Sequence, residues 1–249
     1  MLFGSFYIKE MEIGEDMIYD KIKEGIFINR PNRFIANVTI DGQEETVHVR
    51  NTGRCRELLL PGAKVILEDC SHNKTRKTKY SLIAVWKGDM LVNMDSQVPN
   101  QVVFQSIKDN QIEGFEDVSF IKREVVYGKS RFDIYFESGN KKGFIEVKGV
   151  TLEEDGLAMF PDAPTERGTK HVLEMIDAVE NSYRGIILFL IQMKGPKLFR
   201  TNWEMDKKFS QALKLANEKG VEILAYDSIV TENSIHLDKQ IKVDFDFIG

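Results

Sequence analysis

The sequence predicts an α/β (α+β) protein in two parts, a small β-barrel followed by a larger domain with a mixed sheet. Three observations lead to this expectation. Short stretches of alternating apolar and polar residues, separated by turn residues, follow one another from residue 25 to residue 86. Clear helical periodicity first appears after Asn100, where helices begin to alternate with strands. The 249 residues are enough for two domains that each have a core.

Composition excludes several classes of protein. Two cysteines, Cys55 and Cys70, are too few for a disulfide framework and favour a reducing cytoplasm. No apolar run is long enough to span a bilayer, and the N-terminus lacks a signal-peptide pattern, so we expect a cytoplasmic protein without a membrane partner. The net charge of −5 argues against a uniformly basic surface but is compatible with a local basic groove.

The N-terminal part reads as an extension followed by a barrel. The first 24 residues are acidic and mixed, and we interpret residues 15–24 as a short helix within an N-terminal extension, residues 1–24. The dipeptide Asp41-Gly42 is a hairpin signal between the second and third of five short strands. Five such strands are typical of an OB-like barrel, which we place at residues 25–99. The strands are expected at residues 26–29, 34–40, 45–49, 64–69 and 80–86.

A distinctive segment, Asn-Thr-Gly-Arg-Cys-Arg-Glu-Leu-Leu-Leu-Pro-Gly, occupies residues 51–62. We expect a short helical turn here, which Thr52 caps and Pro61 ends. Arg54 and Arg56 project from the start of this turn. They can meet phosphate there, or they can pair with nearby acidic residues.

A second basic segment, residues 73–79, contains no acidic residue. One interpretation is a solvated loop. On an OB-like barrel, however, such a loop can also hold phosphates, and the sequence leaves both interpretations open. Its basic residues are Lys74, Arg76, Lys77 and Lys79.

The second domain is expected to begin near Asn100, whose side chain can cap a helix over residues 101–110. We therefore assign residues 100–249 to the mixed-sheet domain. Beyond its central strands, two prolines make residues 160–164 irregular. The elements expected after them are a helix capped by Thr165 and ending near residue 181, a strand over 184–192, a helix over 206–218 and a strand over 221–226.

Three adjacent strands joined by two tight turns are expected over residues 124–148. The first turn is Gly128-Lys129, where a glycine in the first central position suits a type II′ hairpin. Residues 138–141 form the second. The turns place these residues opposite one another: Tyr127 and Ser130, Glu137 and Lys142, and Asp133 between Glu124 and Glu146.

The apolar pattern agrees with this register. Five apolar side chains fall together on the face opposite to the carboxylates. A slip by one residue would mix carboxylates into that face, which a half-buried sheet resists. The five residues are Phe132, Ile134, Phe136, Ile145 and Val147.

Three carboxylates, Glu124, Asp133 and Glu146, are thus expected in a row, with Lys148 beyond Glu146 on the same face. Neighbouring carboxylates repel unless a cation lies between them, and oxygen ligands with room for water suit Mg²⁺ or Mn²⁺. Asp133 and Glu146 would hold the metal and Glu124 would assist. Lys148 would position or help to deprotonate a water that attacks a phosphodiester. The alternative is an exposed sheet face with ordinary alternating charges.

The arrangement of Asp133 followed by Glu146-x-Lys148 on the next strand resembles the core of the PD-(D/E)xK nucleases. The order of helix, three strands, helix and strand is the order expected of that core. On the second helix, Lys170, His171 and Glu174 lie three or four residues apart, so one stripe can face the carboxylates. The same stripe can also be plain surface.

Four motifs, in order along the chain, resemble those of the sugar fermentation stimulation protein family. The resemblance implies a DNA-binding protein linked to regulation of sugar (maltose) metabolism, with an OB-like N-terminal part and a nuclease-like C-terminal part. Residues 1–24 extend beyond the usual start of the family. The motifs are Asn-Thr-Gly-Arg-x-x-Glu-Leu-Leu-x-Pro-Gly (51–62), Gly-x-Ser-Arg-x-Asp (128–133), Glu-Val-Lys-x-Val-Thr-Leu (146–152) and Phe-Pro-Asp-Ala-Pro-Thr-x-Arg-Gly-x-Lys-His (160–171).

Two functions from different classes follow. The first is a metal-dependent nuclease that acts on DNA or another structured nucleic acid. The second is a DNA-binding regulatory protein whose nuclease-like site is catalytically idle. A sugar-processing enzyme has little support, because no aromatic platform accompanies the carboxylates. The candidate contacts to nucleic acid are Arg54, Arg56, Lys74, Arg76, Lys77, Lys79, Arg131, Arg167, Lys170 and His171.

Overall fold

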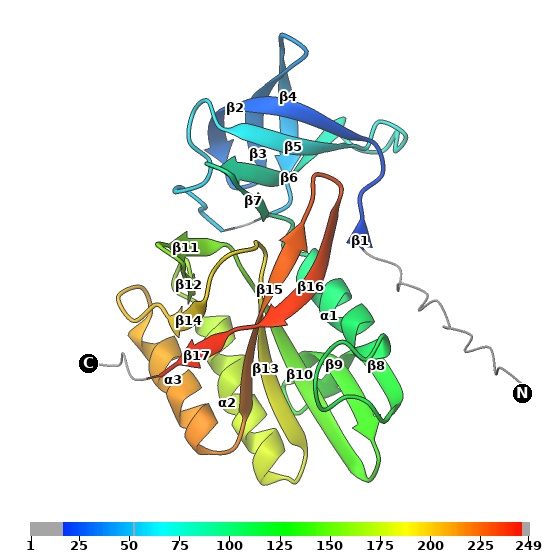
Figure 1. Cartoon of the computed structure of the whole chain (residues 1–249), viewed down its shortest axis with the longest axis vertical. Coiled ribbons are helices and arrows are strands. Elements are labelled where there is room, and N and C mark those ends of the chain that lie inside the picture. Colours follow the sequence, from blue (N-terminus) through cyan, green and yellow to red (C-terminus); the bar gives the residue numbers. More distant parts are fainter. Residues whose placement is uncertain (1–16, 52, 246–249) are drawn as a thin grey trace, which may run out of the picture.

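The structure is a computed structural model, and it describes residues 17–51 and 53–245. A β-barrel sits at one end of a larger α/β part (Figure 1). The predicted fold class, with the barrel first and the mixed sheet second, is confirmed. None of the helices in the described residues is long and apolar enough to cross a membrane.

The barrel is closed by five strands, each paired with its neighbours. Parallel pairing of β4 with β6 closes the ring, and β7 continues from β6 as an antiparallel neighbour. Asp41 and Gly42 join β3 to β4 with φ angles of 50° and 80°, as a type I′ hairpin requires. The strands are β2 (Ile22–Asn32), β3 (Ile35–Ile40), β4 (Gln43–Val49), β5 (Lys64–Asp69), β6 (Tyr80–Lys87) and β7 (Met90–Asn93).

The start of the described chain is extended. The helix predicted over residues 15–24 is wrong where the structure describes it, because β1 (Met17–Ile18) and the beginning of β2 occupy that stretch. Residues 1–16 lie outside the described part. Met17 pairs with Ile235 of β16, so the chain joins the large sheet before it enters the barrel. Pairing with an available sheet edge outweighs the weak helix tendency of so short a segment.

The segment between β4 and β5 makes one helical turn, as predicted. The N–H groups of Leu58 and Leu59 both donate to the carbonyl oxygen of Cys55, at 3.3 Å and 3.0 Å. All three side chains are buried, so the turn is fixed to the barrel by its apolar face. The cap proposed for Thr52 lies outside the described residues.

The α/β part is built on a seven-stranded sheet with the order β1-β16-β15-β13-β10-β9-β8. Alternate residues of the central strand β13 face two separate apolar clusters, one against α1 and the other against α2 and α3. The sequence α1, β8, β9, β10, α2, β13 follows the predicted order. The strands after β1 are β8 (Val118–Tyr127), β9 (Ser130–Ser138), β10 (Lys141–Val150), β13 (Arg184–Ile191), β15 (Glu222–Val230) and β16 (Ser234–Gln240).

Three helices cover the large sheet. They are α1 (Val98–Lys108), α2 (Glu166–Glu180) and α3 (Lys207–Glu218). Thr165 caps α2 as predicted, with its side chain accepting from the N–H of Gly168 at 3.0 Å. The cap predicted at Asn100 is wrong, because α1 begins earlier, at Val98, and carries Pro99 in its first turn, a favourable place for proline.

A small second sheet, which the sequence did not predict, lies along the side of the α/β part, with β11 at the end nearest the barrel and β17 near α3 (Figure 1). Its strands have only three or four residues each, too few to show a period in the sequence. The irregular residues 161–164 follow the second of these strands, after a cis Phe160–Pro161 peptide bond. The strands are β11 (Leu152–Glu154), β12 (Leu157–Phe160), β14 (Leu198–Thr201) and β17 (Lys242–Asp244).

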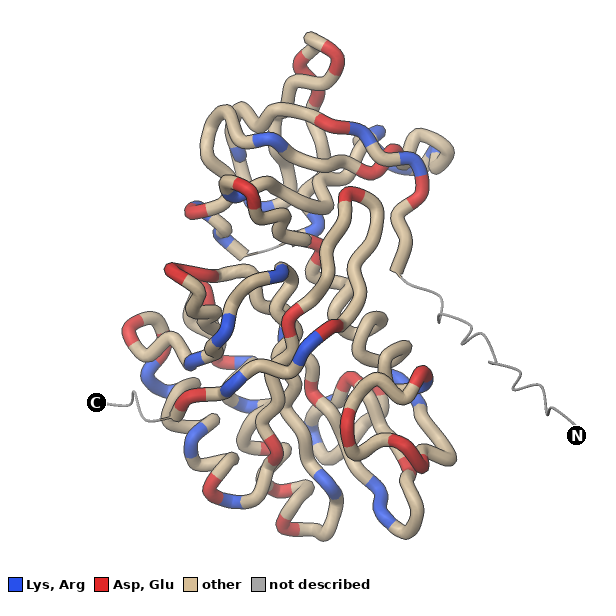
Figure 2. Tube along the Cα trace, in the orientation of Figure 1, with Lys and Arg blue, Asp and Glu red and all other residues tan. Residues whose placement is uncertain are grey.

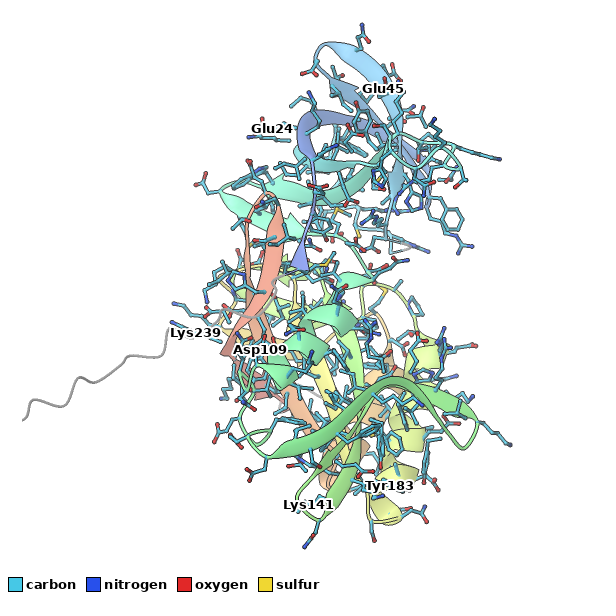
Figure 3. All side chains as sticks on the ribbon, turned by 90° about the vertical axis from the view of Figure 1, so that its right-hand side faces the viewer. Glu24, Glu45, Asp109, Lys141, Tyr183 and Lys239 are labelled. Carbon is cyan, nitrogen blue, oxygen red and sulfur yellow. The ribbon has the colours of Figure 1, made fainter. Side chains whose placement is uncertain are left out.

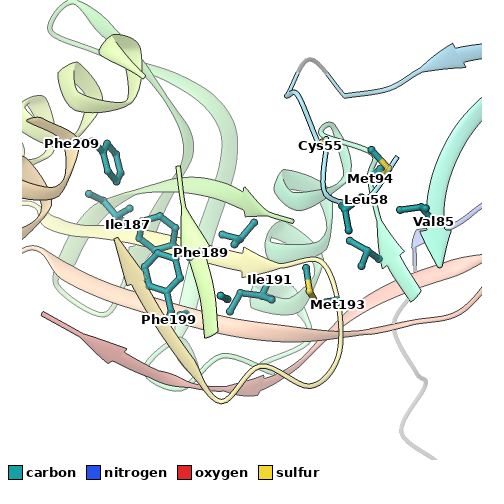
Figure 4. Close-up of a cluster of buried hydrophobic side chains, with 14 of the residues drawn as sticks. Cys55, Leu58, Val85, Met94, Ile187, Phe189, Ile191, Met193, Phe199 and Phe209 are labelled. Atoms are coloured by element: carbon teal, nitrogen blue, oxygen red, sulfur yellow. The ribbon is translucent and has the colours of Figure 1, made fainter. Parts of the chain in front are cut away.

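Both apolar clusters continue from the α/β part into the barrel. The cluster drawn in Figure 4 runs from the barrel, through the segment that links the parts, into the face of the sheet covered by α2 and α3. Burial of a continuous apolar surface favours a fixed arrangement of the two parts. Its labelled members include Cys55, Leu58, Val85, Met94, Met193, Ile191, Phe189 and Phe209.

Candidate functional site

Asp133 and Glu146 belong to neighbouring strands and lie where the ladder between β9 and β10 ends. The predicted pairing of Glu137 with Lys142 is confirmed, and the ladder continues as far as Ile145 opposite Ile134. Asp133 is the next residue of β9 beyond this last pair, and one of its carboxylate oxygens accepts a hydrogen bond from the N–H of Val147 at 2.8 Å. The Asp133 side chain therefore sits between the two strands, next to the position of Glu146.

Asp133 is held in place from two sides. Its second carboxylate oxygen accepts a hydrogen bond from the side-chain amide of Asn100 at 2.7 Å. Burial, together with the nearby charge of Glu146, raises the pKa of Asp133 to about 6, although the hydrogen bonds and Lys148 act against this. Asn100 belongs to α1, so the residue interpreted from the sequence as a helix cap is in fact part of the site.

Glu146 is almost completely buried, with 2% of its surface exposed. Its Oε1 accepts hydrogen bonds from Nζ of Lys148, at 2.6 Å, and from Nδ1 of His171 in α2. Burial is the largest influence on the pKa of Glu146 and raises it, but His171 and Lys148 together outweigh burial and hold the pKa below its ordinary value. Glu146 is thus an ionised carboxylate in the interior. Of the two interpretations left open for the stripe on α2, the one in which it faces the carboxylates holds for His171.

The other oxygen of Glu146, Oε2, is buried and has no hydrogen-bond partner within the described residues. A buried carboxylate oxygen without a partner is costly, and native structures usually provide one. Asp133 adds a second carboxylate close by. Two carboxylates with an unused oxygen are a suitable donor set for a divalent cation, whose remaining positions can be filled by water and phosphate oxygens. We call Asp133 and Glu146 the carboxylate centre.

Glu124 does not belong to the carboxylate centre, so the predicted row of three carboxylates is wrong. Glu124 takes a left-handed φ of 57°, and its side chain is 63% exposed and lies 3.5 Å from Arg131. A left-handed residue breaks the alternation of a strand and turns its side chain out of the pleat. Within the described residues, no group of three or more His, Cys, Asp or Glu side chains is arranged to hold a metal.

The same irregularity changes one of the apolar positions. Ile134, Phe136, Ile145 and Val147 pack together in the cluster against α1, as predicted. Phe132 does not join them. It packs in the other cluster, on the side of α2, with its ring 5.2 Å from that of Phe144. Phe132 and Ile134, two residues apart on β9, therefore pack in different clusters, which the regular alternation of a strand does not predict.

Most of the basic residues predicted on α2 and β9 have local partners, among them Arg131, which lies 3.5 Å from Glu124. His171 is buried against Glu146, and its predicted contact with nucleic acid stays a prediction. Nζ of Lys170 donates to the carbonyl oxygen of Lys129 at 3.1 Å and lies 3.7 Å from Glu174. Arg167 is exposed in the first turn of α2 and stays a candidate contact.

The predicted basic residues of the barrel form two separate groups. Arg54 and Arg56 line a cavity of about 280 Å³ at the edge of the barrel near the α/β part. Residues 73–79 form the loop between β5 and β6, on the other side of the barrel (Figure 1). We call the cavity the arginine pocket, and its walls are Arg30, Asn32, Arg33, Gly53, Arg54, Arg56 and Leu59.

A second cavity, of about 300 Å³, lies between the barrel and the α/β part. Gly53 belongs to the walls of both cavities, and a Cβ atom there would lie 2.6 Å from Oδ2 of Asp162. Only a residue without a side chain allows so close an approach. We call this space the interdomain cavity, and its walls include Asn51, Gly53, Ser96, Gly149, Thr151, Asp162, Thr165 and Gln192.

Comparison with known proteins gives consistent matches along the chain. The family model described as "SfsA N-terminal OB domain" matches residues 28–94, and the one described as "Sugar fermentation stimulation protein RE domain" matches residues 97–234. The sugar fermentation stimulation protein homolog of Alkaliphilus oremlandii is 64% identical over 233 residues, which cover 92% of this chain and 99% of the relative. A homolog from Clostridium botulinum (strain Langeland) is 54% identical over 228 residues, which cover 91% and 99%.

A solved structure is also similar. It is that of Pyrococcus furiosus SfsA in complex with Ca²⁺, with a TM-score of 0.83 and 28% sequence identity. The match covers 92% of this chain and 99% of that one.

Proposed function

The chain belongs to the sugar fermentation stimulation protein family, and we propose that it binds DNA and cleaves it at a divalent-cation-dependent centre of the PD-(D/E)xK type. The observation that carries this proposal is the carboxylate centre. Asp133 and Glu146 are held close together in the interior, and Oε2 of Glu146 lacks a partner within the described residues. Two neighbouring buried carboxylates repel each other and destabilise the folded protein, and a cation bound between them removes this repulsion.

The donor set fits a hard divalent cation. Asp133 and Glu146 would hold it through carboxylate oxygens, the ligands that Mg²⁺, Mn²⁺ and Ca²⁺ prefer. The Pyrococcus furiosus relative is in complex with Ca²⁺, which supports a divalent cation as a ligand of the family fold. When bound, such a cation neutralises charge on a phosphodiester and lowers the pKa of a water molecule. Mg²⁺ and Mn²⁺ are the ions proposed for turnover, since both favour few protein ligands and several waters.

The residues around the centre have distinct roles in the proposal. Asn100 and the Val147 N–H fix the orientation of Asp133, and His171 fixes that of Glu146. Lys148 has 15% of its side chain exposed and can offer its remaining N–H donors to a phosphate oxygen or to an attacking water. Positive charge beside the leaving or attacking oxygen stabilises the transition state of the reaction.

A DNA-binding regulator with an idle centre is the second candidate. The observation that favours it is the displacement of Glu124, which leaves the centre with two protein carboxylates in place of three. Either function places the protein where DNA is found. The free thiols of Cys55 and Cys70 agree with a reducing cytoplasm.

The test is release of fragments from labelled linear, branched and single-stranded DNA in the presence of Mg²⁺, Mn²⁺ or Ca²⁺. We expect the parent protein to cleave with Mg²⁺ or Mn²⁺ and the double variant Asp133→Asn, Glu146→Gln to be inactive while still binding DNA. Glu124→Gln is the matched control, because it removes an exposed carboxylate outside the centre and should leave the rate unchanged. Equal cleavage by the double variant would contradict the proposal, and binding without cleavage by the parent would favour the idle centre.

A further inference from the structure

The arginine pocket is a concentration of positive charge that the carboxylate centre does not explain. Four of its walls are arginines, and none of them forms an ion pair with a carboxylate within the described residues. Arg33, Arg54 and Arg56 are exposed. Figure 2 shows basic positions along this edge of the barrel, where it faces the α/β part. Unpaired arginines around one hollow repel each other and favour an anion between them.

Arg30 organises this pocket. Its guanidinium donates to four backbone carbonyl oxygens, those of Gly53 and Arg54 from Nη1, at 2.8 Å and 2.9 Å, and those of Arg33 and Asn51 from Nη2, at 2.7 Å and 2.6 Å. These bonds fasten the turn after β2 to the segment after β4, so the arginines of both segments are placed together. The carbonyl oxygens bonded to Arg30 are also no longer free acceptors that would repel an anion. The pocket is therefore built in advance for a negative ligand.

The interdomain cavity adjoins the arginine pocket and reaches the part of β10 that follows the carboxylate centre. Gly53 belongs to the walls of both cavities, and Gly149 lies in the wall of the interdomain cavity on the side of β10. Gly149 directly follows Lys148, whose Nζ contacts Glu146. The interdomain cavity therefore lies between the arginines and the strand that carries Glu146 and Lys148, where the backbone of a bound DNA strand could run.

The basic loop of residues 73–79 is differently placed. Arg76 donates to the Ser81 hydroxyl at 2.6 Å, and Lys79 lies 3.6 Å from Glu45. Glu45 lies in the upper half of the barrel, away from the α/β part (Figure 3). Two of the four basic side chains of the loop thus have local partners, and the loop lies far along the barrel from the interdomain cavity.

From these contacts we infer that the arginine pocket binds a backbone phosphate of the same DNA strand whose reactive phosphodiester lies at the carboxylate centre. The inference rests on the proposed function. It assigns the anchoring of that strand to Arg33, Arg54 and Arg56, with Arg30 as the residue that positions them. It also separates this pocket from the loop of residues 73–79, which is basic but is not the anchor.

The test compares two pairs of exposed basic residues of the barrel, each replaced in the full-length chain. Arg54→Gln with Arg56→Gln removes two charges from the arginine pocket, and Lys74→Gln with Lys77→Gln removes two from the loop. Binding of a fluorescent DNA oligonucleotide is measured by anisotropy in Ca²⁺ over a series of salt concentrations. We expect the arginine pair to weaken binding about 10–100-fold and the lysine pair to change it by less than about threefold.

The salt dependence gives a second readout of the same interactions. Removing one protein–phosphate interaction should lower the slope of log K against log salt by about one. The double arginine variant should therefore have a slope that is lower by about one to two, and the double lysine variant should keep the slope of the parent. Arg54→Lys with Arg56→Lys should restore most of the slope while recovering affinity only in part, because lysine keeps the charge but not the forked geometry. In the cleavage assay the effect should fall on KM and leave kcat unchanged.

The outcomes separate this inference from the proposed function. Equal effects of the two pairs, or none from the arginine pair while the parent binds DNA, would overturn the anchor and leave the proposed function intact. A parent that binds no DNA would overturn both. A third outcome is that inorganic phosphate stabilises the parent but not the arginine variant, while the two proteins bind DNA equally well. The pocket would then bind a free anion, and its assignment to a DNA strand would be overturned.

Discussion

The carboxylate centre and the arginine pocket differ in construction as well as in charge. The centre is buried, and its residues come from four helices and strands, α1, β9, β10 and α2. The arginine pocket is exposed and is assembled from the end of β2 and two nearby loop segments. Chemistry on a phosphodiester needs groups fixed by rigid elements, whereas anchoring a flexible strand needs accessible charge. The two regions can therefore be changed independently.

Among substitutions that leave Asp133 and Glu146 in place, we expect the replacement of Lys148 to lower kcat the most. Lys148→Met keeps the length and the apolar stem of the side chain but removes the ammonium group beside Glu146. We expect kcat to fall about 10²–10⁴-fold, as for other residues that position or activate a water. Cation affinity, measured as a rise in melting temperature with Mn²⁺, should be kept or increased, because a competing positive charge has gone. Unchanged kcat would remove Lys148 from the reaction.

The stability of the two regions should respond differently to mutation. His171→Phe removes the ring nitrogen that donates to buried Glu146, and we expect the free energy of unfolding to fall by about 1–3 kcal/mol. Arg54→Gln changes an exposed side chain and should alter it by less than about 0.5 kcal/mol. Urea unfolding of both variants tests the contrast. Equal losses would mean that the arginine pocket is as much a part of the folded core as the centre is.

The pH dependence of stability should report the burial of Asp133 next to the charge of Glu146. Burial and Glu146 raise the pKa of Asp133 from 3.8 to about 6. The folded state therefore binds the proton more tightly than the unfolded state, and this contribution to stability is complete below pH 4 and is lost as pH rises to about 6. Without divalent cations, Asp133→Asn should gain about 1–3 kcal/mol relative to the parent over that interval.

The measurement for Asp133 is urea unfolding of parent and variant at a series of pH values in the presence of a chelator. Asn keeps only one acceptor oxygen and loses one of the two hydrogen bonds, so the difference at any single pH is not informative. The change of the difference with pH is informative, because it follows the titration of Asp133 in the folded protein. A constant difference between about pH 4 and pH 7 would show that the pKa of Asp133 is not raised in the folded protein.

Much of the large sheet could be predicted from the sequence, because the cues were local. Gly128 adopts a φ of 56°, as the first central residue of a II′ turn requires, and Tyr127 pairs with Ser130. These turns fix which residues lie opposite one another, and the apolar pattern then fixes the faces. The approach of Asp133 to Glu146 followed from that register.

The errors arise where the backbone departs from regular geometry. Glu124 was assigned to the centre on the assumption of an unbroken pleat, and its left-handed conformation could not be inferred from a residue type that rarely adopts it. Phe132 was placed on the wrong face for the same reason. Asn100 was missed because its local role as a helix cap was plausible. Arg30 gave no signal at all, since its partners are backbone carbonyl oxygens of distant segments.

The most direct test of the carboxylate centre is diffraction from crystals soaked with Mn²⁺, with anomalous differences recorded for the parent and for Asp133→Asn with Glu146→Gln. The account predicts one strong anomalous peak in the parent, in contact with a carboxylate oxygen of Asp133 and with Oε2 of Glu146, and no peak there in the double variant. A parent whose anomalous density lies elsewhere, with Asp133 and Glu146 unliganded at saturating Mn²⁺, would contradict it.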